Sequence, residues 1–392
     1  MIKVKGYKRA DGSYGIRNKV IIMASVGCAN ETARRVAENV NGLVFIQAGK
    51  GCGQVGDAVE ITKRTMTGFA LNPNVYGAII IGLGCETIQP FPLQDRIMAA
   101  TDKPVYAMSI QEEGGTIRTI DKATRIARKL LTEASKQPQV EFDLSHLLLA
   151  TNCGGSDATS GLAPNPALGV ASDKLVAVGG SVMFGETTEL IGTEHILARR
   201  AKDEQTKDRL LTIIHGLEQQ FADLGVDVRG ANPSPGNQKG GLSTLEEKAL
   251  GGISKGGTTP INEVLKYGEI PSEKGLVVMD TPGYDIESVT GMSAAGAQLC
   301  VFTTGRGTPI GNPIMPMLKI TGNKITYQKM DDNIDLDLSG IVDGKMSIEE
   351  GGQMIFDKLI DICNGEQTKA ESFGFNEVAI YRNNEVWCCN LD

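Results

Sequence analysis

The first third of the chain repeats one pattern four times: an apolar run, a loop that contains glycine, and then a helical stretch. Strands that alternate with helices form a parallel sheet with right-handed crossovers, so the loops that follow the strands lie on one edge of the sheet. This part of the chain is therefore expected to form an α/β domain. The expected strands are residues 20–24, 43–47, 76–81 and 105–109.

Three of these loops carry a cysteine: Cys28, Cys52 and Cys85. A single cysteine in a loop is usually inert, but three at the same position of successive strand–helix units would converge in space. We therefore expect these thiols to meet at one site. Glu86 directly follows Cys85 and could add a carboxylate to that site.

The remainder of the chain predicts a second domain of the same class. At 392 residues the chain is too long for one small core. A polar stretch with a proline, residues 136–142, marks the expected boundary, which divides the chain into domains at residues 1–138 and 139–392. The predicted fold is α/β, with two Rossmann-like parallel-sheet domains in which loops at the strand carboxyl ends form the site.

The sequence TNCGGSDATSGLAPNP, residues 151–166, is unusually rich in reactive side chains. It follows an apolar run, so Cys153, Ser156 and Asp157 are expected on the loop beyond the carboxyl end of a strand. The glycines after Cys153 leave backbone N–H groups free to approach an anion, and the thiol, hydroxyl and carboxylate supply metal-ligand and acid–base chemistry. The alternative interpretation is a turn that carries a buried cysteine.

Charged side chains also adjoin other expected strands. Glu186 and Glu189 come directly after the strand expected at residues 181–184, which suits a general base or a hard metal ligand, although Glu189 could instead begin a helix. Arg17 precedes the first strand and is interpreted either as a carboxylate ligand or as a surface charge.

Two glycine-rich segments of the second domain could bind an anion. Lys239 and Lys255 each adjoin paired glycines within residues 229–257, a long segment that is either a functional loop or a flexible linker. The loop after the strand expected at residues 299–303 combines a guanidinium, a hydroxyl and an amide, and so predicts a carboxylate clamp. Its side chains are Arg306, Thr308 and Asn312.

Composition excludes several classes of protein. The net charge is −8 and no basic block is interleaved with aromatic residues, which argues against nucleic-acid binding. No apolar run approaches the roughly 18 residues of a membrane span, and no signal peptide is evident, so we expect a cytoplasmic protein.

Eight cysteines in such a chain do not form a disulfide framework, and no function is assigned to Cys388 and Cys389. Motifs for dinucleotides, P-loop nucleotides and serine hydrolases are absent from the sequence.

Several long motifs together resemble the large, catalytic region of the altronate/galactarate dehydratase family, which is also related to the large subunit of sulfolactate sulfo-lyase. The resemblance covers nearly the whole chain. The motifs are GYKRADGSYGIRN, GLGCE, CGGSDATSGLAPNPALG, NPSPGNQKGGLSTLEEKALG, MDTPGYDIESVTG and FTTGRGTPIGNPIMP.

This resemblance implies a lyase that acts on a 2,3-dihydroxy carboxylate. A base would remove the proton at C2, the C3 hydroxyl would leave, and the enol would become a 2-keto-3-deoxy acid. Hydroxide is a poor leaving group, so a Lewis acid is needed, and iron is the metal that the resemblance implies. The expected ligands are Cys52, Cys85 and Cys153, with Cys28 as a possible fourth and Glu86 as an added one.

The form of the iron and the identity of the base stay open. The iron is either an iron–sulfur cluster with one open iron or a mononuclear Fe2+. Relatives often carry a histidine where this chain has Lys50, so Lys50, Asp157 and Glu186 are the candidate catalytic residues. The expected substrate-binding residues are Arg17, Asn30, Gln54, Ser156, Lys239, Arg306, Thr308 and Asn312.

The resemblance also bears on partners and on the reaction. Single-chain members carry a small SAF-type domain before the large region, so we expect a separate small subunit to supply it within an oligomer. The sulfo-lyase branch expels sulfite and is expected to lack the cysteine loops, so their retention here favours dehydration. The alternatives are sulfite elimination from sulfolactate and a non-catalytic subunit that carries iron for its partner.

Overall fold

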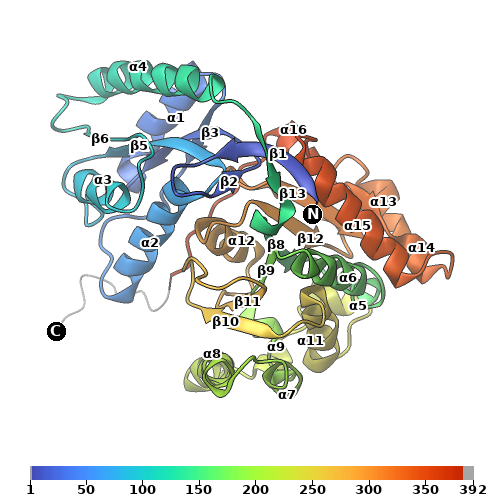
Figure 1. Ribbon diagram of the computed structural model, residues 1–392. Helices are drawn as coiled ribbons and strands as arrows, with labels where there is room; N and C mark the ends of the chain where they lie inside the picture. Colours follow the sequence, from blue (N-terminus) through green and yellow to red (C-terminus); the bar gives the residue numbers. More distant parts are fainter. Residues whose placement is uncertain (1, 383–392) are drawn as a thin grey trace.

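The computed structural model describes residues 2–382 and contains two parallel sheets (Figure 1). One has four strands in the order β4-β3-β5-β6, and the other has seven in the order β10-β11-β9-β8-β12-β13-β14. A small antiparallel sheet, β2-β1-β7, lies beside them. Its strands are β1 (Lys3–Lys8), β2 (Tyr14–Gly15) and β7 (Val140–Asp143).

The four-stranded sheet is covered by helices on both faces. Its strands are nearly continuous apolar runs, as expected for parallel strands buried on both sides. Helices α1 and α4 pack on one face, and α2 and α3 pack on the other. The strands are β3 (Lys19–Ala24), β4 (Leu43–Ile46), β5 (Val75–Gly82) and β6 (Val105–Ser109); the helices are α1 (Asn30–Asn39), α2 (Asp57–Leu71), α3 (Pro90–Met98) and α4 (Thr116–Ser135).

The seven-stranded sheet forms the larger part of the molecule. All of its strand pairs are parallel. Its strands are β8 (Leu148–Cys153), β9 (Ser181–Phe184), β10 (Ile261–Leu265), β11 (Leu276–Met279), β12 (Leu299–Thr303), β13 (Met317–Thr321) and β14 (Leu336–Asp337).

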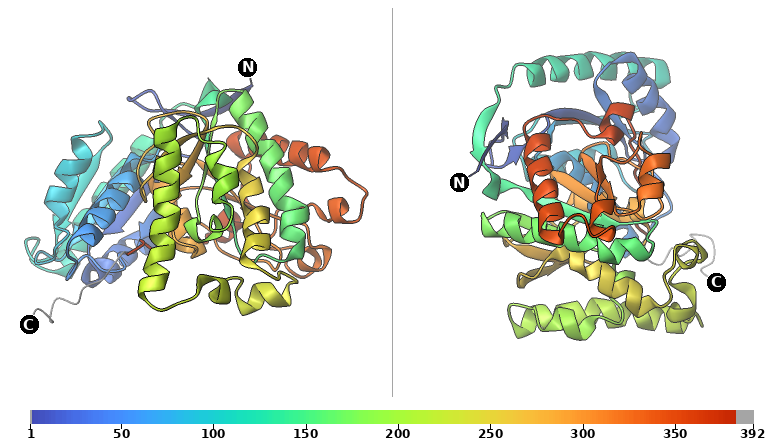
Figure 2. Two further views of the ribbon diagram at one scale, coloured as in Figure 1. Left: turned by 90° about the horizontal axis from the view of Figure 1, so that it is seen from below. Right: turned by 90° about the vertical axis from the view of Figure 1, so that its right-hand side faces the viewer.

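Helices cover both faces of this larger sheet as well. The main apolar core lies between the sheet and helices that include α6, α8, α11 and α15, while α12 packs on the opposite face. Figure 2 shows α4 and α8 at opposite ends of the molecule. The helices are α5 (Ala158–Leu162), α6 (Pro164–Ala177), α7 (Glu194–Ala198), α8 (Glu204–Asp223), α9 (Val228–Ala231), α10 (Pro235–Lys239), α11 (Leu245–Ile253), α12 (Asp285–Ala294), α13 (Lys324–Lys329), α14 (Ser339–Val342), α15 (Ile348–Cys363) and α16 (Lys369–Phe373).

The two sheets are joined where α2 packs against α12. Gly68 of α2 lies so close to α12 that a Cβ there would collide with the carbonyl oxygen of Ala294. Asn72, at the end of α2, donates hydrogen bonds to the carbonyl oxygens of Ser293 and Ala297. These contacts fix the orientation of the smaller sheet on the larger one.

The structure confirms the predicted α/β class and its parallel sheets. It corrects one detail that affects the site: β8 extends to Cys153, which ends the strand instead of lying on the following loop. The prediction also omitted β10 and the small antiparallel sheet. Because β7 pairs with β1, the chain on the two sides of residue 138 shares that sheet, and the domain boundary there stays a prediction.

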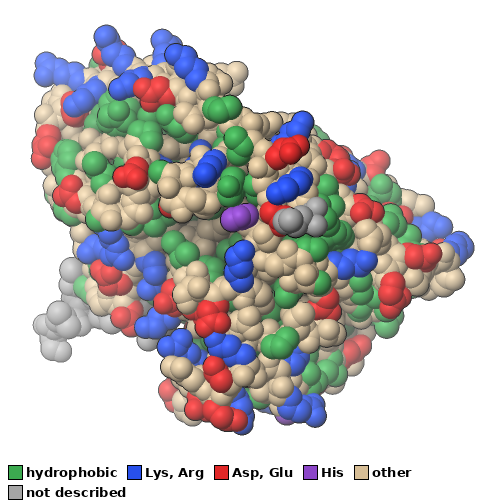
Figure 3. All heavy atoms as spheres, in the orientation of Figure 1, with side chains coloured by type: hydrophobic (Ala, Val, Ile, Leu, Met, Phe, Trp, Pro, Cys, Tyr) green, Lys and Arg blue, Asp and Glu red, His purple; other side chains and the backbone are tan. Residues whose placement is uncertain are grey.

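Two further observations concern the helices and the surface charge. None of the helices in residues 2–382 has the length and apolar character needed to cross a membrane. Figure 3 shows acidic and basic side chains mixed over one face, with a group of Lys and Arg along α4. Cys388 and Cys389 lie outside the described residues.

Candidate active site

The candidate site lies at the carboxyl end of β8, where the order of the large sheet changes direction. The chain leaves β8 for its neighbour β9 on one side and later returns to its other neighbour, β12. In open parallel sheets, ligands bind in the crevice outside the strands at such a point. Cys153 ends β8 and Glu186 follows β9, so both lie at this crevice.

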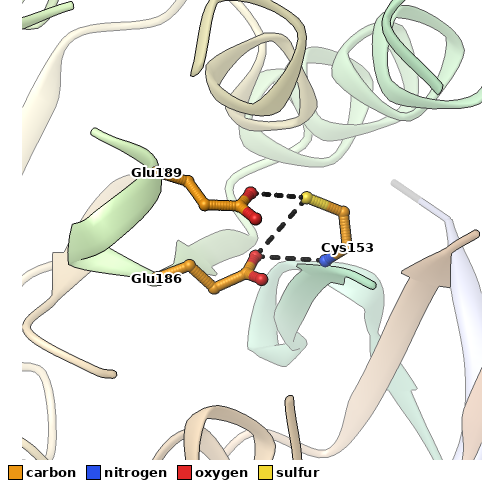
Figure 4. Close-up of side chains that lie close together, drawn as sticks. All are labelled: Cys153, Glu186 and Glu189. Atoms are coloured by element: carbon orange, nitrogen blue, oxygen red, sulfur yellow. Dashed lines mark hydrogen bonds between the residues drawn. The ribbon is translucent and has the colours of Figure 1, made fainter. Parts of the chain in front are cut away.

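Two carboxylates contact the thiol of Cys153 (Figure 4). The Sγ atom lies 3.0 Å from Oε2 of Glu189 and 3.6 Å from Oε2 of Glu186. The backbone N–H of Cys153 donates to the same oxygen of Glu186 over 3.1 Å. All three side chains are buried and their ligand atoms lie within 4.8 Å of one another, so this group could bind a metal ion. Within residues 2–382 it is the one such group of His, Cys, Asp and Glu side chains.

Two lysines already neutralise this acidic group. The ammonium of Lys255, which is only 1% exposed, lies 2.6 Å from Glu186 Oε2, 3.2 Å from Cys153 Sγ and 3.9 Å from Glu189 Oε2. Lys248 pairs with the other oxygen of Glu189 over 2.9 Å. Together these contacts form a buried network of one thiol, two carboxylates and two ammonium groups.

Burial and these charges shift the pKa values of the network. Burial, Glu186 and Glu189 raise the pKa of Cys153 well above its ordinary value, although Lys255 opposes the shift. Burial and Glu189 also raise the pKa of Glu186. Burial would raise the pKa of Glu189, but Lys248 and Lys255 outweigh it and hold that pKa below the usual range. The two carboxylates are thus driven in opposite directions, a pattern found in acid–base pairs.

The backbone at Glu186 is strained in a way that supports the network. Glu186 is the one non-glycine residue of the described chain with a positive φ, 67°. Such a conformation costs of order 1–3 kcal/mol and persists where surrounding contacts determine it. Here the backbone N–H of Glu186 donates to Thr281 Oγ1 over 2.6 Å, and Asn152 Nδ2 donates to the Glu186 carboxylate.

The network borders a cavity of about 940 Å³. Cys153, Glu189 and Lys248 form part of its wall, together with Asp285 and Arg306. The loop between β8 and α5 and the short helices α9 and α10 provide further lining. A second cavity of about 300 Å³ shares Cys153 and Lys248 with the first. The larger cavity, with the polar side chains named above on its wall, suits a small polar ligand.

Asp285 places a carboxyl group with an unusual pKa in the cavity wall. Burial and the charge of Glu189 raise its pKa to about 7. Asn152 Nδ2 donates to Asp285 Oδ1 over 3.1 Å and so joins this carboxyl to Glu186. Gly154 lies against it so closely that a Cβ would collide with both carboxyl oxygens. A carboxyl with a pKa near neutrality suits a general base or acid.

Three residues at the site were not assigned to it from sequence: Lys248, Lys255 and Asp285. Lys255 was considered only as one of two lysines beside glycines, and the other, Lys239, is exposed and does not line the cavity. Lys248 lies on α11, whose helix cap at Thr244 is a feature of many ordinary helices and does not indicate a functional site. Folding brings Lys248 and Lys255 to the carboxylates and Asp285 to the cavity wall, and no local sequence pattern indicates this.

The cysteines of the small sheet lie apart from Cys153 in the chain and in exposure. Cys28, Cys52 and Cys85 are exposed and follow β3, β4 and β5, three adjacent strands of the smaller sheet. Cys153 is buried in the network described above. The expected metal ligands thus differ in exposure and in the sheet that carries them, and their assignment as one set stays a prediction.

Several residues expected to bind substrate have hydrogen-bond partners within the chain. Arg17 uses all five guanidinium N–H groups: two bind the carboxylate of Glu371 and three bind backbone carbonyl oxygens. Asn30 exchanges two hydrogen bonds with the backbone of Ala48, and Gln54 donates to Thr62. These contacts hold loops and helix ends together, although the buried Oε1 of Gln54 has no hydrogen-bond partner among the described residues.

Other expected residues divide between the cavity and the scaffold. Arg306 is exposed, lines the large cavity and donates to the carbonyl oxygen of Gly236, while Ser156 lines both cavities. Asn312 is buried, and its Oδ1 accepts hydrogen bonds from two backbone N–H groups of its own loop. Thr308 lies outside the lining of the large cavity, with its Oγ1 bonded to the N–H of Ile310.

The three candidate bases also lie in different places. Asp157 caps helix α5, where its side chain accepts from the N–H of Thr159 and from Asn323. Lys50 lines a small pocket beside the Cys52 loop. Glu186 lies in the network but is fully buried behind Lys255.

Comparison with known proteins matches both parts of the chain to described families. Residues 144–386 match the C-terminal domain of D-galactarate/altronate dehydratase, and residues 6–135 match the second domain of D-galactarate dehydratase/altronate hydrolase. The beta subunit of (2R)-sulfolactate sulfo-lyase from Chromohalobacter salexigens is 37% identical over 379 residues, which cover 96% of each chain.

Two longer relatives are named dehydratases. Altronate dehydratase from Bacillus subtilis is 32% identical over 388 residues, which cover 96% of this chain and 77% of the relative. Galactarate dehydratase (L-threo-forming) from Escherichia coli is 36% identical over 402 residues, which cover 96% of this chain and 76% of the relative.

Proposed function

The chain belongs to the D-galactarate/altronate dehydratase family, and we propose that it is a lyase that removes water from a sugar acid with hydroxyl groups at C2 and C3. The product would be a 2-keto-3-deoxy acid. The observation that carries this proposal is the buried Cys153–Glu186–Glu189–Lys255 network, which borders a cavity at the reversal point of the large sheet.

Substrate binding is assigned to the cations of the cavity wall. Arg306 is exposed to the cavity and can bind a carboxylate through its planar fork. Burial would lower the pKa of Lys248, but the charge of Glu189 outweighs it and raises that pKa, so the side chain stays protonated. Its ammonium can stabilise negative charge that develops on the substrate when the C2 proton leaves.

Proton transfer at C2 is assigned to Asp285. Its carboxyl group lies in the cavity wall, and its pKa of about 7 lets it accept a proton near neutral pH. Among the bases expected from sequence, Asp157 serves as a helix cap and Glu186 is fully buried. Glu186 is therefore a positioning residue that holds Lys255 and the backbone of Cys153.

Iron is the cofactor that the family implies, and two sets of residues offer ligands for it. Cys153, Glu186 and Glu189 lie close enough to hold an ion, but the ammonium of Lys255 lies among them. The exposed thiols of Cys28, Cys52 and Cys85 form the second set. Bound iron would supply a Lewis acid for the departing hydroxyl group.

Sulfite elimination is the second candidate reaction. The relative that matches this chain over 96% of both lengths is a sulfo-lyase subunit. Sulfite leaves more readily than hydroxide, so this reaction would place less demand on a Lewis acid. The same residues would bind the substrate carboxylate and remove the proton.

A partner subunit is also proposed. The sulfo-lyase relative is named subunit beta, so that enzyme has more than one kind of subunit. We propose that this chain likewise acts with a second, smaller subunit, for which the SAF-type domain of the family is the candidate.

The proposal is tested by incubating the iron-loaded protein, with its copurified subunits, with altronate and galactarate under anaerobic conditions. The assay measures release of a 2-keto-3-deoxy acid. Asp285→Asn should lower kcat by roughly 10²–10⁴-fold, the usual contribution of a general base. Asp343→Asn, at a more exposed carboxylate that pairs with Lys345, is the matched control and should retain activity. Full activity in Asp285→Asn would remove Asp285 from the mechanism.

A further inference from the structure

We propose that Cys28, Cys52 and Cys85 form a separate three-thiolate site for an iron–sulfur cluster on the smaller sheet, and that Cys153 is not one of its ligands. The inference rests on the proposed function only in taking iron as the metal. It divides the expected metal ligands into two sites with different chemistry.

The three cysteine loops are tied to one another by hydrogen bonds. The N–H of Gly27, next to Cys28, donates to the carbonyl oxygen of Lys50 over 2.8 Å. The N–H of Ile88 donates to the carbonyl oxygen of Gly51, next to Cys52, over 2.9 Å. The loops of Cys28 and Cys85 are therefore each fastened to the loop of Cys52.

A close approach at Gly51 strengthens this arrangement. Gly51 has a φ of 95°, and a Cβ there would collide with the carbonyl oxygen of Ser25. Only glycine allows both this conformation and this contact. The loop that carries Cys52 therefore lies directly against the chain that leads to Cys28.

The carboxylate of Glu86 links two of these loops through hydrogen bonds and is not free. Its Oε1 accepts hydrogen bonds from Ser25 Oγ and from the N–H of Leu83, and its Oε2 accepts one from the N–H of Gly84. The side chain is buried. Glu86 thus joins the loop of Cys85 to the strand end that precedes Cys28, and we assign it a positioning role beside the thiols.

The exposure of these three thiols is the feature that calls for a ligand. Cysteine is among the most frequently buried residue types, and Cys153, Cys300 and Cys363 follow that rule. Three exposed thiols on three adjacent loops have no packing role that would explain them. Thiolates are soft ligands that select iron–sulfur clusters, zinc or copper(I).

The spacing of the thiols argues against a single ion held by all three. Zinc–sulfur bonds of about 2.3 Å in a tetrahedral site bring the sulfur atoms within roughly 3.8 Å of one another. In residues 2–382, Cys153 with its two glutamates is the one group whose ligand atoms all lie within 4.8 Å. The three exposed sulfur atoms are therefore spaced more widely than one ion requires. A cluster spans a wider gap, and three thiolates leave one of its irons open to another ligand.

The position of the site connects it with the substrate cavity. Tyr381 lines the large cavity, while its neighbours Ile380 and Arg382 line the small pocket that also contains Lys50 and Gly51. One short segment therefore borders both the cavity and the loop of Cys52. The two sites are neighbours although they belong to different sheets.

The test compares serine variants of each cysteine after anaerobic reconstitution with ferrous iron, sulfide and a thiol reductant. Bound iron, acid-labile sulfide and visible absorption are measured without substrate, so the outcome does not depend on turnover. The wild type and Cys153→Ser are expected to take up iron and sulfide equally, whereas Cys28→Ser, Cys52→Ser and Cys85→Ser should each lose most of both. Far-ultraviolet circular dichroism checks that each variant is folded.

A second readout uses the intact sequence. Alkylation followed by peptide mass spectrometry should find the three exposed cysteines protected in the reconstituted protein and modified after treatment with a chelator. Cys363, buried in the core, is the internal control and should stay unmodified in both. Iron that is lost from Cys153→Ser but kept in the other three variants would overturn the inference, as would a wild type that takes up no iron and sulfide. A lack of turnover on sugar acids, by contrast, would contradict the proposed function and leave the cluster site standing.

Discussion

Removing the positive charge of Lys255 tests whether the buried network is held together as described. Lys255→Met keeps an unbranched side chain of similar length but leaves Glu186 without its cation in a site that water does not reach. Removing one partner of a buried ion pair costs about 3–5 kcal/mol. The ammonium makes three such contacts, at 2.6, 3.2 and 3.9 Å, so the loss for Lys255→Met is expected within that range.

The assay is thermal and urea unfolding at neutral pH. For a chain of 392 residues the expected loss corresponds to a fall of roughly 4–6 °C in the unfolding midpoint. Lys345→Met is the matched control, because Lys345 is 72% exposed and forms a surface ion pair with Asp343. It should change the free energy of unfolding by less than about 0.5 kcal/mol.

A double variant separates loss of charge from loss of packing. Glu186→Gln removes the carboxylate that Lys255 neutralises, so Lys255→Met combined with Glu186→Gln should recover about 1 kcal/mol or more of the loss. A Lys255→Met protein as stable as Lys345→Met would refute the reasoning. Absence of any recovery in the double variant would show that packing, and not charge, accounts for the effect.

Three other outcomes follow from the cavity. Gly154→Ala should displace the Asp285 carboxyl and reduce kcat, measured by product release, whereas Gly216→Ala, on an open helix face, should leave kcat unchanged. Arg306→Ala should raise KM more than it lowers kcat, because Arg306 faces the cavity. Arg17→Ala should lower the unfolding midpoint, since the five N–H groups of Arg17 bind within the chain. Since a base must be unprotonated, kcat/KM should fall about tenfold per pH unit below the Asp285 pKa of about 7, and a profile flat from pH 5 to 8 would exclude Asp285 as the base.

The strands could be predicted where the sequence signal is strong and local. Buried parallel strands appear as continuous apolar runs, so β6, β9 and β12 were predicted at their observed bounds. Strand β10 has the sequence INEVL, in which half-buried Asn262 and Glu263 interrupt the apolar pattern. The antiparallel strand β1 alternates exposed lysines with buried residues and is too polar to stand out.

The site was predictable only in the residues that directly follow strands. Cys153 and Glu186 lie at strand ends, where the geometry of a parallel sheet makes convergence expected. Lys255 meets Cys153 across 102 positions of sequence, and no local pattern distinguishes it from the exposed Lys239. Arg17 shows the opposite error: its sequence context suits a ligand, but the fold brings Glu371 to it from 354 positions away.

The reaction itself is tested most directly by one comparison of products. The iron-loaded protein with its copurified subunits is incubated in parallel with altronate, galactarate and (2R)-sulfolactate, and both 2-keto-3-deoxy acid and sulfite are measured. The proposed dehydratase should form the keto acid from a sugar acid and release no sulfite. Sulfite from sulfolactate, without keto acid from either sugar acid, would contradict it and assign the cavity to carbon–sulfur cleavage.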